Sequence, residues 1–212
     1  HPKSVAFIDG LNTFYGRPDI PVGAVREGVT PQKGRYLQLV EQTCEQGDLL
    51  YPHDLRDSSE AIDAVALLRQ TLADQPDGSV TLVQVGFFTN LAQLLMSEPD
   101  EHSSLMGRAL VAAKVSQLVV MAGEFGNLKG GNGHREYNVV RDLRSAHLVT
   151  ALWPTPILWS GFEIGNAVRY PWESILRDYD YRGPHPIKEG YILYCAGQNR
   201  PTWDLTAVLQ AV

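Results

Sequence analysis

The sequence predicts an α/β fold in which a mostly parallel sheet is flanked by helices around a Rossmann-like core. Short runs rich in β-branched residues alternate along the chain with longer amphipathic runs, which is the pattern of strands joined by crossover helices. The 212 residues are 44% apolar, which is enough for one large core. Because no internal repeat, low-complexity tract or linker interrupts the pattern, we expect a single domain over residues 1–212.

The alternating pattern assigns the individual elements. Strands are expected at residues 20–25, 80–85, 117–121 and 156–159. Helices are expected at 61–73, behind Ser58 and Ser59 as caps, and at 90–96, 105–115, 143–152 and 187–194. A last helix opens at Trp203-Asp204 and still continues where the sequence stops, and the first residue is not a methionine. We therefore expect further sequence at both ends.

Charge and cysteine content exclude several classes of function. The formal net charge is −6 and basic runs are missing, so nucleic acid is not expected as a partner. Cys44 and Cys195 are too few and too far apart for a disulfide framework or a thiolate zinc site, and both are expected in the core. No apolar run approaches the roughly 20 residues that span a bilayer, so no membrane partner is expected and a cytoplasmic location is favoured.

Ligands of such sheets bind beyond the carboxyl ends of the strands. The segments 86–90, 122–125 and 160–165 follow three of the expected strands, and each carries glycine with oxygen-bearing or aromatic residues. The loop that follows residues 122–125 contains GGNGHREYN, residues 130–138. We expect these segments to face the functional site.

The end of that loop carries a carboxylate and an amide. In extended backbone, Glu136 and Asn138 would point to the same side and could hold neighbouring hydroxyls of a sugar or polyol. The alternative, which the spacing alone favours, is that Asn138 caps a turn while Glu136 is solvated. Tyr137 would point the other way and pack inward in both cases.

Two further positions combine a capping role with a possible cation role. Thr89-Asn90 follows a strand and a glycine, so it can cap the next helix and leave strand-end carbonyls free for a hard cation. Asp204 is well placed as an N-cap, with a metal ligand as the alternative. Capping is the better-supported role for both when each is considered alone.

Other motifs give little support for a catalytic or ligand-binding role. His53-Asp54 has no second histidine at ligand spacing and is expected in a loop. The glycines of residues 126–133 match neither GxGxxG nor GxxxxGK[ST], and no Gly-x-Ser-x-Gly elbow is present. Phosphate cradling and acyl transfer therefore have little support.

Six segments, taken in order, carry a resemblance to a known family. They are LNTFYGRPDIP at 11–21, VQVGFFTNLAQLL at 83–95, VVMAGEF at 119–125, the loop ending REYN at 135–138, PTPILWSGFEIG at 154–165 and PTWDLTAVLQAV at 201–212. As an ordered set they resemble the inosine-uridine-preferring nucleoside hydrolase family over nearly the whole chain. That family cleaves the N-glycosidic bond of ribonucleosides with water, using a calcium ion at the bottom of an α/β pocket.

The resemblance implies a role for several residues. The Thr89 backbone carbonyl and the Asp204 carboxylate would bind calcium, and Asn138 would bind the ribose diol. Glu136, with Asn132 as a helper, would receive the 5′-hydroxyl. The aromatic residues that could form walls for the base or the ribose are Phe87, Phe88, Phe125 and Trp203. A homo-oligomer is compatible with this reading.

Two departures from the family pattern shape the functional hypotheses. The family's Asp-Thr-Asp-x-Gly-x-Asp-Asp cluster supplies most calcium ligands and the base that activates water, but only Asp9-Gly10 approaches it here. The catalytic base therefore stays unassigned. The histidine that often precedes the last aspartate, and assists departure of the base, is Trp203 in this chain, so leaving-group activation or nucleoside preference must differ.

Three hypotheses remain open from the sequence. The leading one is a calcium-assisted nucleoside N-ribohydrolase. The alternative is a non-catalytic nucleoside- or sugar-binding protein on the same scaffold, and the third is another α/β hydrolase that acts on sugar derivatives.

Overall fold

The structure, a computed structural model, describes residues 1–29, 33–126 and 134–212. The chain divides into two compact units, which are described separately. We call the first the helical unit; it comprises His1–Arg26, Thr30–Ala64 and Tyr170–Arg200. The second, the sheet unit, comprises Glu27–Val29, Val65–Arg169 and Pro201–Val212. The chain passes from one unit to the other within the short strand β6 (Arg169–Tyr170) and again within β7 (Arg200–Pro201). A single domain over the whole chain stays a prediction.

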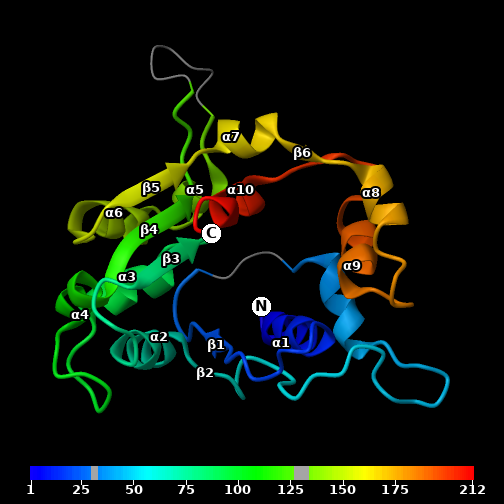
Figure 1. Ribbon diagram of the computed structural model, residues 1–212, viewed down its shortest axis with the longest axis horizontal. Helices are drawn as coiled ribbons and strands as arrows, with labels where there is room; N and C mark the ends of the chain where they lie inside the picture. Colours follow the sequence, from blue (N-terminus) through cyan, green and yellow to red (C-terminus); the bar gives the residue numbers. More distant parts are fainter. Residues whose placement is uncertain (30–32, 127–133) are drawn as a thin grey trace. The chain divides into compact units, whose positions relative to one another are not determined.

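The sheet unit is built on a three-stranded parallel sheet with the strand order β3-β4-β5 (Figure 1). Its strands are β3 (Val80–Gln84), β4 (Val115–Met121) and β5 (Ile157–Ser160). Gln84 is paired with Val120, and Met121 is paired with Ser160, so the carboxyl ends of the three strands lie side by side. The parallel sheet confirms the predicted fold class, and these strands lie within two residues of three expected ones.

Both faces of the central strand are buried. Leu118 and Val120 point into the larger hydrophobic cluster, whereas the alternate residues Val119 and Met121 pack with Ala207 on the other face. This arrangement explains why the strand is a continuous apolar run rather than an alternating one. The helices that build the larger cluster are α2 (Ala64–Ala73), α3 (Thr89–Met96), α4 (Gly107–Lys114) and α6 (Leu143–Leu152). The other face is covered by α10 (Trp203–Leu209).

An ion pair with a buried arginine fixes the loop between α3 and α4. The Arg69 side chain, 2% exposed, donates from Nε and Nη2 to the two carboxylate oxygens of Asp100 at 2.7 and 3.0 Å. It also donates to Ser97 Oγ and to the carbonyls of Ser103 and Leu105. This guanidinium lowers the pKa of Asp100 to about 2. The loop therefore depends on one buried cation.

The helical unit is assembled from shorter elements. Its helices are α1 (Lys3–Phe14), the 3-10 helix η1 (Arg35–Glu41), α8 (Trp172–Arg177) and α9 (Pro186–Cys195). A two-residue parallel pair joins β1 (Gly23–Ala24) to β2 (Ile62–Asp63). A small cluster of Val5, Val22, Ala24 and Ala61 forms part of its core.

Several sequence expectations fail in the helical unit. The strand expected at 20–25 is reduced to two residues, and the helix expected at 61–73 begins only at Ala64, because residues 62–63 pair as a strand. The caps expected at Ser58 and Ser59 lie in a turn ahead of that pair instead. Cys195 is buried as expected, but Cys44 is half-buried in a loop. Across the described ranges, no helix has the length and hydropathy needed to cross a membrane.

Candidate functional site

Gly123 joins the segments that follow β4 and β5 at the carboxyl edge of the sheet. This residue follows β4 and has a φ of +77°, a conformation that glycine adopts without strain. Its N–H donates to Glu136 Oε2 at 3.1 Å, and its carbonyl accepts from the N–H of Phe162 at 2.8 Å. One residue thus ties the end of the 130–138 loop and the segment after β5 to the same strand end.

Glu136 is a buried N-cap. Its side chain accepts from the backbone N–H groups of Asn138, at 2.8 Å, and Val139, at 3.1 Å, in addition to Gly123. These bonds open the short helix α5 (Tyr137–Arg141), and the residue is 6% exposed. A carboxylate offers about four acceptor positions, so one remains, on Oε1.

The expected local geometry around Glu136 was wrong in three respects. The residues after Glu136 are helical rather than extended, because its carboxylate satisfies the orphan N–H groups of the first turn. The cap is therefore Glu136, which is not solvated, and not Asn138. Tyr137 is 48% exposed instead of packed inward, and its ring lies 5.7 Å from that of Phe87.

Asn138 is buried at the end of β4. Its Nδ2 donates to the Met121 carbonyl at 3.0 Å and lies 3.4 Å from the Met121 sulfur. The amide therefore adjoins the carboxyl end of the sheet, where ligands of parallel sheets bind. Its role as the ribose clamp stays a prediction. Asn132, the predicted helper, lies outside the described residues.

Thr89 is the first residue of α3 and is not its cap. The N-cap is Phe88, which makes no side-chain capping bond, so the capping role expected for Thr89-Asn90 was wrong. The Thr89 hydroxyl instead donates to Asp142 Oδ2 at 2.6 Å, and both residues are buried. Within the helix the Thr89 carbonyl accepts from the N–H four residues on, which leaves one further lone pair. Gly28 packs so close to Thr89 that an added Cβ would lie 2.4 Å from its methyl group.

Trp203 is held against α7 (Phe162–Ala167). Its Nε1 donates to the Phe162 carbonyl at 3.0 Å, and the two rings stack with centroids 5.3 Å apart and planes 28° apart. At Gly165 an added Cβ would lie 2.3 Å from the Trp203 Cα, so α7 and α10 approach at a distance that only glycine permits. Asp204 is exposed in the first turn of α10, where the helix dipole favours a carboxylate, and the N-cap is Thr202 rather than Asp204.

The predicted aromatic walls differ in accessibility. Phe88 is fully buried in the core, which removes it from any ligand-facing surface. Phe125 is 42% exposed and lies 6.1 Å from the ring of Trp159. Sequence reasoning missed His134, which is exposed and whose ring centroid lies 4.0 Å from that of Phe162. The signal that could have indicated it is its place two residues before the carboxylate that anchors the loop.

The described residues do not form a calcium site by themselves. Across residues 1–29, 33–126 and 134–212, no group of three or more His, Cys, Asp or Glu side chains could hold a metal. Calcium takes six to eight oxygen ligands, and Thr89 and Asp204 would supply two. Asp9, the nearest approach to the family's aspartate cluster, is 6% exposed and accepts from the N–H groups of Asp54 and Leu55 at 2.7 and 3.0 Å. Its observed contacts are structural.

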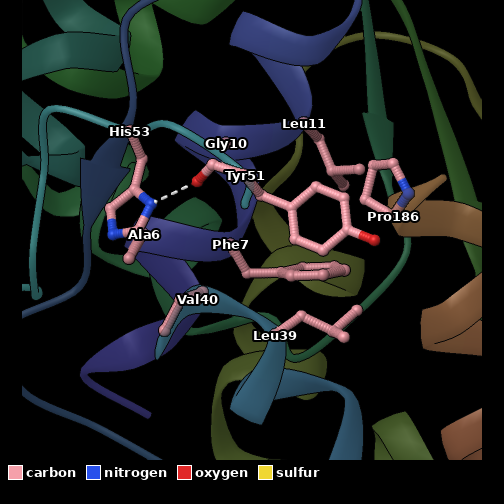
Figure 2. Close-up of a pocket in the computed structure, with 9 residues that line it drawn as sticks. All are labelled: Ala6, Phe7, Gly10, Leu11, Leu39, Val40, Tyr51, His53 and Pro186. Atoms are coloured by element: carbon pink, nitrogen blue, oxygen red, sulfur yellow. Dashed lines mark hydrogen bonds between the residues drawn. The ribbon is translucent and has the colours of Figure 1, made fainter. Parts of the chain in front are cut away.

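A pocket in the helical unit is a second place to look for ligands (Figure 2). It encloses about 210 Å³, open space included, below the usual size of small-molecule sites. Tyr51 lines it, and its buried hydroxyl has no hydrogen-bond partner within the described part of the chain. Burial raises the pKa of Tyr51, and the nearby Glu189 carboxylate raises it further. His53 Nδ1 lies 2.8 Å from the Tyr51 carbonyl, in a loop as expected. None of the predicted site residues that the structure describes lines this pocket.

Comparison with known protein families shows to which family the chain is related. The profile of the family described as "Inosine-uridine preferring nucleoside hydrolase" matches residues 8–209. The chain belongs to this family. The match covers both units and confirms the resemblance inferred from the six ordered segments.

Curated proteins that are similar to this chain include pyrimidine-specific ribonucleoside hydrolases RihA. The protein from Shewanella woodyi is 27% identical over 201 residues, which are 92% of this chain and 58% of that protein. The protein from Klebsiella pneumoniae subsp. pneumoniae is 29% identical over 164 residues, 76% of this chain and 48% of that protein. The chain thus spans about half the length of the curated relatives that it matches.

Solved structures support the fold. A plant nucleoside hydrolase, the PpNRh1 enzyme, aligns with a TM-score of 0.61 at 22% identity, over 99% of this chain and 60% of that one. The type III effector protein XopQ, solved with adenosine diphosphate ribose, aligns with a TM-score of 0.59 at 19% identity, over 91% and 52%. At such identities the likeness shows a shared fold.

Proposed function

We propose that the protein hydrolyses the N-glycosidic bond of ribonucleosides to free base and ribose. Family membership over residues 8–209 supports this activity, as do relatives named as ribonucleoside hydrolases. The single observation that carries the proposal is the convergence, at the carboxyl edge of the parallel sheet, of Glu136 and Asn138 from the start of α5 with Trp203 from the start of α10.

The chemistry of the reaction suits these residue types. Departure of the base leaves an oxocarbenium-like ribose, which water must meet at C1′. The Asn138 amide and the remaining acceptor position of Glu136 would orient the ribose hydroxyls for that attack. Holding the sugar in one orientation contributes through proximity as well as charge. The base that activates water is not assigned to any described residue.

The activity is tested on the protein as its source cell makes it. Inosine and uridine are incubated with it separately, and the release of reducing sugar is measured. Hydrolysis of at least one of them supports the proposal. Tight binding of both without release of ribose would overturn the hydrolase and favour a nucleoside-binding protein.

We extend the proposal to calcium dependence, with Thr89 and Asp204 as the ligands that this chain contributes and the rest supplied by residues beyond those described. Chelation should abolish activity, and added calcium should restore it. Asp204→Ala should lower the calcium affinity measured by titration, because one charged oxygen ligand is lost. An unchanged affinity would remove Asp204 from the site.

A further inference from the structure

Three rings form a stack at the carboxyl edge of the sheet unit. We call His134, Phe162 and Trp203 the ring stack: Phe162 lies 4.0 Å from His134 and 5.3 Å from Trp203 between ring centroids. The planes of both pairs are within 32° of parallel. Stacked rings at such distances attract one another beyond their buried area.

The ring stack is held by backbone contacts that the sheet itself provides. Gly123 bonds Glu136 through its N–H and Phe162 through its carbonyl, so the segments that carry His134 and Phe162 are both tied to the end of β4. The indole N–H of Trp203 bonds the Phe162 carbonyl, and Gly165 permits the close approach of α10. The imidazole is therefore positioned by three elements while its residue stays exposed.

His134 differs in position from the other histidines of the sheet unit within the described ranges. His102 lies in the connection between α3 and α4, 3.8 Å from a carboxylate oxygen of Glu101, and His147 is exposed on α6. Of these three, only His134 belongs to the ring stack. Histidine is the side chain that exchanges a proton most readily near neutral pH.

We propose that His134 donates the proton that neutralises the leaving base, an assignment that rests on the proposed hydrolase function. As the C1′–N bond breaks, its electron pair moves to the base nitrogen, and the imidazolium proton passes to the base. Water forms the new bond to C1′ and releases a proton to solvent, from which the imidazole is reprotonated. The sum is nucleoside plus water giving base plus ribose.

The test compares leaving groups that need a proton with one that does not. His134→Phe keeps an aromatic ring against Phe162 but removes the acid. Its kcat/KM should fall about 100- to 10,000-fold on inosine or uridine. On p-nitrophenyl β-ribofuranoside, whose phenolate leaves without protonation, it should change less than about threefold, since general acid assistance is then not needed.

The matched control is His147→Phe, the same substitution at an exposed histidine on α6, which should leave both rates unchanged. Equal losses on the two kinds of substrate, or no loss on either, would overturn the role of His134. If the unsubstituted protein cleaves neither kind, the hydrolase function itself fails, and the role of His134 fails with it. A thermal unfolding curve of His134→Phe that matches the unsubstituted protein assigns the loss to chemistry rather than to folding.

Discussion

The sheet unit and the helical unit hold their polar groups in different ways. In the sheet unit, two of the buried polar side chains lie at a strand end: Glu136 and Asn138 both bond the backbone that closes β4. In the helical unit, Asp9 ties α1 to a loop 45 residues later, and the buried Tyr51 hydroxyl has no hydrogen-bond partner within the described part of the chain. The difference teaches that a parallel sheet concentrates polar groups at one edge, which is what a binding site requires.

The largest expected effect tests how far the sheet unit depends on buried charge. Arg69→Ala should lower the free energy of unfolding by about 4 kcal/mol, because it removes the cation that Asp100 pairs with and leaves two carbonyls without their side-chain donor. The lowered pKa of Asp100 means that this ion pair stabilises fully above about pH 4 and loses its effect as pH falls toward 2. The difference in free energy of unfolding between the two proteins, measured by denaturant titration, should therefore narrow over that interval, and the part that comes from the two carbonyls should persist. A constant difference from pH 6 to pH 2 would contradict the role of this pair.

The next effect compares the two buried carboxylates directly. Glu136→Ala should cost about 3 kcal/mol, since three backbone N–H groups lose their acceptor, and Asp9→Ala about 2 kcal/mol, since two do. Only Glu136→Ala should also impair nucleoside hydrolysis at temperatures where both variants are folded. Denaturant unfolding and activity are measured on the same samples. Equal loss of activity in both variants would contradict the placement of the site in the sheet unit.

The smallest effect concerns the pocket of Figure 2. Tyr51→Phe should change the free energy of unfolding by no more than about 1 kcal/mol, because the interaction of the hydroxyl with the nearby Glu189 carboxylate and the cost of burying that hydroxyl offset one another. Denaturant unfolding of the variant and the unsubstituted protein measures this difference in stability. A loss above about 1.5 kcal/mol would show that the hydroxyl is bonded, for example to an ordered water.

The sheet was predictable because its signal is local. The β4 run is apolar at every position since both faces are buried, and the α6 boundaries, Leu143–Leu152, follow from helical periodicity alone. The helix α1 was missed, since it contains a buried Asp9 and Gly10 whose partners are loop residues more than 40 positions away. Such long-range bonds leave no periodic pattern in the sequence.

The site was predictable only in part. The resemblance named the segments that carry the candidate site, but the state of Glu136 depends on Gly123, 13 residues earlier, and no local pattern predicts that bond. The stacking of His134 on Phe162 likewise joins segments that are far apart in sequence. The sequence therefore indicated which residue types belong to the candidate site. Their hydrogen bonds and ring contacts could be identified only from the three-dimensional structure.

The measurement that tests the central claim most directly is the binding of a C-nucleoside, in which a carbon–carbon bond replaces the N-glycosidic bond. Calorimetric titration would compare the unsubstituted protein with Asn138→Ala and Tyr51→Phe. If the carboxyl edge of the sheet unit is the site, Asn138→Ala weakens binding by about 5- to 150-fold, as expected when a buried partner loses 1–3 kcal/mol, and Tyr51→Phe leaves it unchanged. Weakening by Tyr51→Phe with no effect of Asn138→Ala would contradict the account and move the site to the helical unit.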